Sequence, residues 1–196
     1  MKLAIASNNA HKLTEIRAIL GDTFGEILSM RDLGLQMEIV EDGDTFLANA
    51  LIKARAVSER TGLPALADDS GLCVNALDGA PGVHSARYAG EPCNDANNNR
   101  LLLQRLHERE KTHPVDRRAS FVSVVVLYYP DGTYLHAQGT CDGVILDEAR
   151  GDNGFGYDPY FYSDELQMTF AQADGERKNS VSHRARALHA LVEQLH

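Results

Sequence analysis

The chain has 196 residues, of which 43% are hydrophobic and 24% charged, and its formal net charge is −9. This length and composition predict one globular domain over residues 1–196, with a core large enough to divide into two lobes. The negative charge argues against a protein that binds nucleic acid or an anionic membrane through a basic face.

The three cysteines and the apolar stretches of the sequence bear on the cellular compartment in which we expect the protein. Cys73, Cys93 and Cys141 are widely spaced, so we expect buried, reduced thiols, with neither a fully paired disulfide framework nor a zinc site. The apolar run at the start is too short for a signal peptide, and none reaches the length of a membrane span. We therefore expect a cytoplasmic protein.

The first elements are a buried strand over Leu3–Ala6 and a helix that starts directly after a polar turn. That turn reads Ser7-Asn8-Asn9-Ala10-His11-Lys12. Free N–H groups at a helix start can cradle phosphate, and Lys12 would add positive charge. Taken alone, the segment favours the simpler alternative, which is N-capping by Asn8 or Asn9.

A second strand is expected over Gly25–Ser29, and a polar passage follows it to Asp44. Asp44 is a good N-cap, and apolar residues at helical spacing from Thr45 predict a helix that stops at Gly62. Without other information, Glu41 would be a solvated loop acid, and Lys53, outside the apolar stripe, a surface lysine.

An apolar stretch at Leu63–Ala67 suits a short buried strand and is followed by Asp68, Asp69, Ser70 and Gly71. Ligands of open α/β sheets lie beyond the carboxyl ends of strands, so adjacent aspartates there can hold a divalent cation and orient a water. The alternative is a plain Asp-Asp-Ser-Gly turn.

The middle of the chain predicts a functional loop, a helix and a hairpin. Residues 71–90 are rich in glycine and small side chains, and Asn97–Glu110 has leucines at helical spacing. Residues 121–129 and 134–138 are rich in β-branched and aromatic residues and flank a Pro-Asp-Gly turn, which is typical of a β-hairpin. A further strand is expected over 144–146.

A second loop, residues 151–159, combines three glycines with two aromatic rings. Its rings could stack on a nucleobase and its carboxylate could accept from a ring N–H, or it could be a simple turn before the strand 160–162. The final amphipathic helix places Lys178 and Arg184 near a helix start, where a cation opposes the helix dipole. That placement indicates that both residues face an anion or a ligand.

The segments "SNNAHK", "ADDSGL", "GAPGVHSARYAG", "GFGYDP" and "SHR" occur in this order. Through them the chain resembles the Ham1/RdgB family of inosine triphosphate pyrophosphatases over nearly its whole length. The resemblance implies an elongated α/β fold of two lobes around a central mixed sheet and a homodimer. It also implies Mg²⁺-dependent hydrolysis of dITP, ITP and XTP to the monophosphate and pyrophosphate.

The resemblance also implies roles for individual residues. Asp69 is the catalytic base and, with Glu41, serves the metal. The residues expected to contact the nucleotide are Ser7, Asn8, Asn9, Ala10, His11, Lys12, Lys53 and Lys178 at the phosphates, Ser70, and Phe155, Gly156, Tyr157, Asp158, His183 and Arg184 at the base. Asn8 departs from the family, since many members have glycine at that position.

This set of residues makes chemical sense for attack of water on the α-phosphorus. A metal and cations offset the charge of the triphosphate, and a carboxylate orients or deprotonates the water. The alternatives are a pyrophosphatase acting on another modified nucleotide, a phosphatase that releases orthophosphate, and a module that binds nucleotide without hydrolysis. The intact acid and lysine set argues against the last, because binding alone needs no water-orienting acid.

Overall fold

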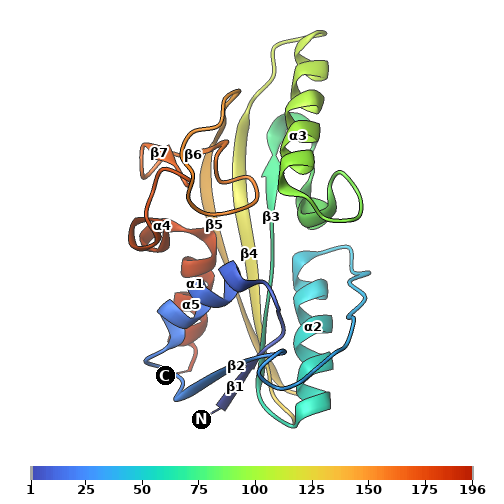
Figure 1. The fold of residues 1–196 in the computed structure, drawn as a ribbon, viewed down its shortest axis with the longest axis vertical. Coiled ribbons are helices and arrows are strands. Elements are labelled where there is room, and N and C mark those ends of the chain that lie inside the picture. The colour runs from blue at the N-terminus through green and yellow to red at the C-terminus, as the bar shows by residue number, and fades with distance from the viewer. Residues whose placement is uncertain (1, 196) are drawn as a thin grey trace. The chain divides into compact units, whose positions relative to one another are not determined.

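A computed structural model describes residues 2–195, which form seven strands, five α-helices and two short 3-10 helices (Figure 1). The strands are β1 (Lys2–Ile5), β2 (Glu26–Ser29), β3 (Ala65–Val74), β4 (Arg118–Tyr128), β5 (Tyr134–Ile145), β6 (Phe161–Ser163) and β7 (Met168–Thr169). The helices are α1 (Ala10–Leu20), α2 (Phe46–Thr61), α3 (Asp95–Glu110), α4 (Gly175–Val181) and α5 (His183–Glu193), with short 3-10 helices η1 (Asn75–Leu77) and η2 (Gly82–Arg87).

The strands form one seven-stranded sheet in the order β2-β1-β3-β4-β5-β6-β7. Strand β1 pairs in parallel with β2 and β3, whereas β6 pairs antiparallel with β5 and β7. The sheet is therefore mixed, and the predicted α/β class is confirmed.

The chain divides into two compact units. The first contains residues 1–69, 123–139 and 183–196, and the second contains residues 70–122 and 140–182. The chain passes from one unit to the other within three strands, β3, β4 and β5.

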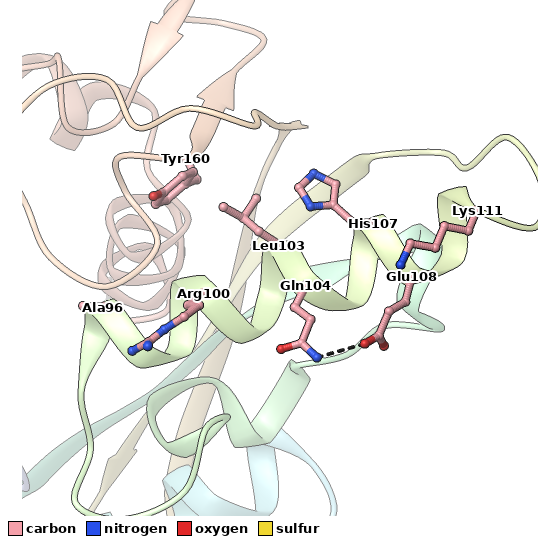
Figure 2. A pocket seen from close by; sticks show the side chains of 8 residues that line it. All are labelled: Ala96, Arg100, Leu103, Gln104, His107, Glu108, Lys111 and Tyr160. Atoms are coloured by element: carbon pink, nitrogen blue, oxygen red, sulfur yellow. Dashed lines mark hydrogen bonds between the residues drawn. The ribbon is translucent and has the colours of Figure 1, made fainter.

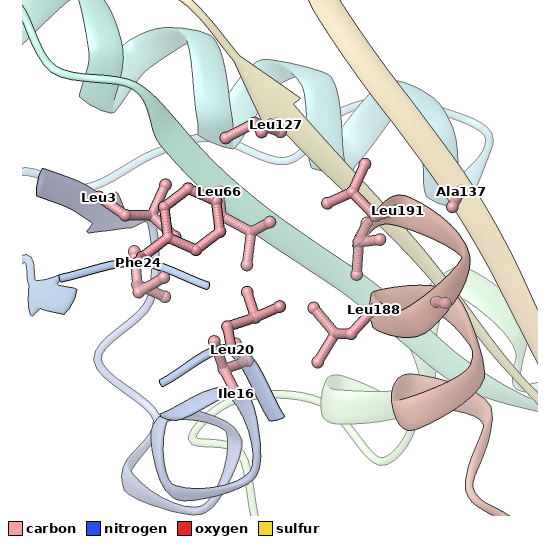
Figure 3. Packing of buried hydrophobic residues seen from close by; sticks show 12 residues of the cluster. Leu3, Ile16, Leu20, Phe24, Leu66, Leu127, Ala137, Leu188 and Leu191 are labelled. Atoms are coloured by element: carbon pink, nitrogen blue, oxygen red, sulfur yellow. The ribbon is translucent and has the colours of Figure 1, made fainter. Parts of the chain in front are cut away.

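In the first unit, one face of the strands carries large aliphatic side chains. Leu3 and Ile5 of β1 and Leu66 of β3 are fully buried there, together with Val125 and Leu127 of β4. Helices α1 and α5 cover them with the side chains shown in Figure 3, namely Ile16, Leu20, Leu188 and Leu191. Alternate residues of a strand point to opposite faces, so this face follows from the sequence.

The opposite face of the same strands carries small side chains. Ala4 of β1 and Ala65 and Ala67 of β3 pack against α2, together with Ala6, which directly follows β1. That helix contributes Ala50, Ala54 and Val57, all without exposed area. Alanine on both sides lets helix and sheet approach closely, since the distance between packed elements depends on the side chains at the contact.

The core of the second unit is built around aromatic rings. Phe121 of β4 lies 4.6 Å from the ring of Phe161 and 5.7 Å from that of Phe170, measured between centroids. Leu102 and Leu106 of α3 pack against the same cluster. These two leucines belong to the stripe that predicts α3.

Several predicted boundaries are wrong. Asp44 is not the cap of α2, because the side chain of Thr45 accepts from the N–H of Ala48. Strand β5 is continuous to Ile145, so no separate strand covers 144–146. The single last helix is two helices with Ser182 between them, and Lys178 lies in the last turn of α4, where a cation suits the dipole.

The largest difference concerns β3. Asp68, Asp69 and Ser70 lie inside this strand, which runs on to Val74. The predicted strand end and the alternative turn are therefore both wrong. Buried aspartates can stay within a strand when cations neutralise them, and both have such partners.

The cysteine prediction holds in part. Cys141 is buried and none of the three cysteines forms a disulfide, but Cys73 is partly exposed and Cys93 is exposed. Between residues 2 and 195, the chain forms no helix with the length and apolar character needed to cross a membrane.

Candidate active site

Two carboxylates of the first unit, those of Glu41 and Asp69, meet at the ammonium group of Lys53. Its Nζ lies 2.8 Å from Oδ1 of Asp69 and 2.7 Å from Oε2 of Glu41, and it donates to the carbonyl oxygen of Asp68 at 3.1 Å. Lys53 is only 8% exposed and Asp69 only 7%. The readings of Lys53 as a surface lysine and of Glu41 as a solvated acid are therefore wrong.

Burial and pairing move the pKa values of this cluster in different directions. Burial raises the pKa of Asp69, although Lys53 opposes the shift. Burial would also raise the pKa of Glu41, but the neighbouring Lys53 outweighs it and lowers that pKa. Burial alone would lower the pKa of Lys53, but its two carboxylate partners raise it. Lys53 is therefore a firmly charged cation between two acids of unequal strength.

The cluster contains a carboxylate oxygen without a partner. Oδ2 of Asp69 is buried and makes no hydrogen bond in the structure, whereas Oδ1 accepts from Lys53. A buried acceptor left unpaired is costly, so this oxygen is a candidate for contact with a water, a metal ion or a substrate.

The loop that carries Glu41 is held by a residue that the sequence reading missed. Asn49 of α2 is 2% exposed, and its Oδ1 accepts from the N–H of Gly43 at 2.9 Å. A side chain at Gly43 would meet the Cβ of Ala48 at 2.7 Å, so the loop lies close to the helix. The one feature of the sequence that points to this role is an asparagine next to the apolar stripe of α2.

A second network surrounds Asp68, whose side chain is also buried. Its Oδ2 lies 2.8 Å from Nζ of Lys12 and accepts from Nε and Nη2 of Arg184 at 3.2 and 3.1 Å. Nη1 of Arg184 pairs with Glu15, and the hydroxyl of Ser123 donates to Oδ1 of Asp68. Four elements, α1, β3, β4 and α5, thus contribute to one buried charged network.

The pKa of Asp68 is strongly depressed in this network. Burial alone would raise its pKa, but Arg184 and Lys12 together hold it well below the usual range. Burial lowers the pKa of Lys12, and Asp68 opposes that shift. Arg184 is 1% exposed, so its guanidinium is packed inside the first unit.

At the start of α1, the capping alternative is confirmed for Asn9. Its side chain accepts from the N–H groups of His11 and Lys12 at 3.0 and 3.1 Å, and Ser7 accepts from the N–H of Asn9. Asn8 is exposed. The contact of this turn with phosphate stays a prediction.

In the second unit, the loop over residues 151–159 is built around a buried ion pair. Nζ of Lys178 lies 2.8 Å from Oδ2 of Asp158, and both residues are at most 5% exposed. The same ammonium group lies 4.9 Å from the ring centroid of Phe155 and 5.5 Å from that of Phe170. The structure thus brings together Phe155, Asp158 and Lys178.

Glycine is required at position 154 of this loop. Gly154 has a φ of +75°, and a Cβ there would approach Oδ2 of Asp158 at 2.1 Å. That oxygen also accepts from the N–H of Phe155 at 3.0 Å. The loop is therefore a defined structure in which the aspartate orders the backbone.

Two further predicted residues lie next to these groups along the chain. Ser70 follows Asp69 within β3 and is partly buried, and His183 is the first residue of α5 and 5% exposed. Their contact with substrate stays a prediction.

The hollow in Figure 2 lies elsewhere, along α3. It measures about 590 Å³, and Leu103 and His107 face it from the helix while Tyr160 lies opposite. Its lining includes none of the predicted site residues. The chemistry-bearing groups are therefore found by their charges and burial, not by the size of this hollow.

Known proteins similar to this chain have one type of activity in their names. The model of the Ham1 family matches residues 3–194. The dITP/XTP pyrophosphatase of Desulforamulus reducens is 48% identical over 195 residues, covering 100% of this chain and 96% of the relative. That of Haemophilus influenzae is 47% identical, covering 99% and 98%.

Solved structures are similar over the whole chain as well. A HAM1 protein from Coxiella burnetii gives a TM-score of 0.89 at 41% identity, covering 100% of this chain and 98% of the other. A nucleoside-triphosphatase / dITP/XTP pyrophosphatase from Mycobacterium abscessus gives 0.75 at 43% identity, covering 98% and 99%.

Proposed function

Because the chain belongs to the Ham1 family, we propose that it hydrolyses the nucleoside triphosphates of non-standard purines, dITP, ITP and XTP, to the monophosphate and pyrophosphate. The names of the relatives support this reaction. The structural observation that carries it is the buried Asp69, which has one oxygen on Lys53 and the other without a partner.

We assign a Mg²⁺ ion to Glu41 and Asp69. The described residues contain no group of three or more histidine, cysteine or acidic side chains placed to hold a metal. Two carboxylates nevertheless suit Mg²⁺, which keeps several waters and takes its other ligands from substrate phosphates. The unpaired Oδ2 of Asp69 fits this role. When bound, the ion would supply charge stabilisation for the phosphates.

The side chains of the first unit suit the remaining steps of the reaction. Asp69 orients a water and accepts its proton while the water oxygen forms a bond to the α-phosphorus. The bond from that phosphorus to the bridging oxygen breaks, and pyrophosphate leaves. Burial raises the pKa of Asp69, which makes its carboxylate a better proton acceptor. Lys53 and Lys12 offset the negative charge, and Ser7 to Lys12 line the phosphates.

We assign recognition of the base to the loop Phe155–Asp158. Lys178 and Ser70 are further proposed contacts to the nucleotide substrate. The ring of Phe155 can stack on a purine, and the backbone and carboxylate of the loop can read its edge. His183 and Arg184 are further proposed contacts to the base. A guanidinium only donates hydrogen bonds, and that of Arg184 already donates to Asp68 and Glu15, so the 6-oxo group of hypoxanthine would have to compete with these carboxylates for a donor.

We further propose that residues 1–196 act as one domain, since the family model spans both units. By resemblance to the family we also propose a homodimer. The substrates belong to the intracellular nucleotide pool, which supports a cytoplasmic location. Light scattering on the purified protein tests the dimer.

The deciding experiment is a panel of ITP, dITP, XTP, ATP and GTP with Mg²⁺, with products resolved by chromatography. We expect monophosphate and pyrophosphate from the first three and little turnover of ATP or GTP. Release of orthophosphate and a diphosphate would indicate a phosphatase instead. Binding of ITP without turnover would indicate a nucleotide-binding module, and either result would overturn the proposal.

A further inference from the structure

The first turns of α3 hold one residue of the proposed base-binding loop by both of its backbone polar groups. The N–H of Gly156 donates to Oδ2 of Asp95 at 2.7 Å. The carbonyl oxygen of Gly156 accepts from Nδ2 of Asn99 at 2.8 Å. Residues four apart lie on one face of a helix, so Asp95 and Asn99 form a pair that fits the two backbone polar groups of one residue.

The backbone conformation of Gly156 affects the conformation of the whole base-binding loop. Gly156 lies between Phe155 and Tyr157 and has a φ of +62°, in the left-handed region that favours glycine. Such a residue has many accessible conformations when nothing holds it. The hydrogen bonds from α3 select one of them, and this choice sets the direction in which the Phe155 ring leaves the backbone.

The same turns of α3 also hold a second segment of this unit. Nδ2 of Asn98 donates to the carbonyl oxygen of Ala86 at 2.9 Å, and its Oδ1 accepts from the N–H of Ala89 at 2.8 Å. Asn98 is 2% exposed and Asn99 is 7% exposed. Asparagine is a poor helix former, so buried asparagines here cost helix stability and are explained by the loops that they hold.

We propose that Asp95 and Asn99 are positioning residues for recognition of the base. They act through Gly156 and order the loop so that Phe155 meets the purine ring without rearrangement. The proposal rests on the proposed function, which assigns this loop to the base. It predicts a larger defect in nucleoside recognition than in phosphate binding, because Lys12, Lys53 and Asp69 belong to the first unit and the ion pair of Lys178 with Asp158 does not include Gly156.

The test compares Asp95→Ala with Asp95→Asn. Asparagine keeps a side-chain oxygen that can accept from Gly156, and alanine removes it. Asp95 is exposed, so both variants should fold. Asn99→Asp is the second variant, because it keeps the shape and removes the donor. Steady-state kinetics with ITP are combined with competitive inhibition by inorganic tripolyphosphate, which carries three phosphates and no base, with Mg²⁺ in excess.

For Asp95→Ala and Asn99→Asp we expect KM for ITP to rise roughly five- to tenfold, the cost of one lost hydrogen bond, with a smaller change in kcat. The inhibition constant of tripolyphosphate should stay within about twofold of the wild type, and Asp95→Asn should behave like the wild type. An unchanged KM in both variants would overturn the proposal. Equal weakening of ITP and tripolyphosphate would overturn it too, since that is the result of a general structural role.

Hydrogen exchange of the Gly156 amide, followed by NMR, gives a readout that needs no activity. Exchange should speed up at least tenfold in Asp95→Ala and remain slow in Asp95→Asn. Unchanged exchange in Asp95→Ala would contradict the hold on Gly156. A wild-type enzyme without ITP turnover would overturn the proposed function instead, and the exchange measurement would then decide whether Asp95 orders the loop.

Discussion

Replacing Arg184 with alanine should destabilise the protein strongly, whatever its effect on the base. The guanidinium bridges the carboxylates of Asp68 and Glu15, and its side chain is only 2% exposed. Removing one partner of a buried ion pair leaves an uncompensated charge, which typically costs about 3–5 kcal/mol. In a chain of this length, each kcal/mol lowers Tm by roughly 2–4 °C. We therefore expect Tm to fall by roughly 6–20 °C.

The measurement is thermal unfolding followed by circular dichroism at pH 7. A double-mutant cycle with Asp68→Asn should show coupling, because the double variant no longer buries an Asp68 charge that has lost Arg184. Arg55→Ala is the matched control. Arg55 pairs with Glu59 on the exposed face of α2, and such a surface pair contributes only about 0.3–0.5 kcal/mol.

The loss should also depend on pH in a defined direction. The pKa of Asp68 is depressed in the folded protein, so its contribution to stability is present above the unfolded pKa and lost as the pH falls. Without Arg184, the pKa of Asp68 would be less depressed, because Lys12 would remain as the cation that opposes the effect of burial, so protonation would relieve part of the damage. The gap in stability between wild type and Arg184→Ala should therefore narrow as the pH falls toward 4.

A Tm within about 3 °C of the wild type, with additive effects in the cycle, would refute this account of the network. In that case the buried carboxylates would not depend on Arg184 for neutralisation.

Three further predictions concern the proposed reaction. Asp69→Asn should lower kcat by at least about a hundredfold while ITP binding stays measurable by calorimetry, and near-normal turnover would remove Asp69 from the mechanism. Activity should vanish with excess chelator and return with Mg²⁺, and full activity in chelator would contradict the metal assignment at Glu41 and Asp69. Gly154→Ala should raise KM for ITP and lower Tm because its Cβ would meet Asp158, and an unchanged KM would argue against the importance of this loop geometry.

The sequence predicts the first unit well because its signals are local. Leu3 and Ile5 of β1 alternate with Ala4 and with Ala6, which directly follows the strand. The apolar stripe of α2 ends at Gly62, which adopts the left-handed conformation expected of a helix stop. These features need only the geometry of a strand or a helix. The spacing of apolar residues is therefore sufficient to predict these elements.

Long-range pairing explains what the sequence reading missed. Asp68 and Asp69 read as the end of a strand because charge is rarely buried, but cations from distant segments neutralise them and β3 continues. Lys53 reads as a surface residue because no local feature reveals that two acids meet it. The contacts of Asp95 with Gly156 join residues 61 positions apart, so no pattern of spacing could predict them.

The alanine face of the first unit has a consequence for how the enzyme tolerates substitution. Lys53 is carried by α2 beside Ala54, and this helix rests on Ala67 and other methyl groups of the sheet. The distance between α2 and the sheet therefore sets how far the ammonium group of Lys53 reaches toward Asp69. A larger residue at Ala54 or Ala67 would shift the helix outward, and a displacement of about 1 Å near a reacting centre can cost roughly a hundredfold in rate. In a library randomised at these two positions, many clones should remain well expressed yet lack ITP hydrolysis, so this face of the core would limit activity before it limits folding.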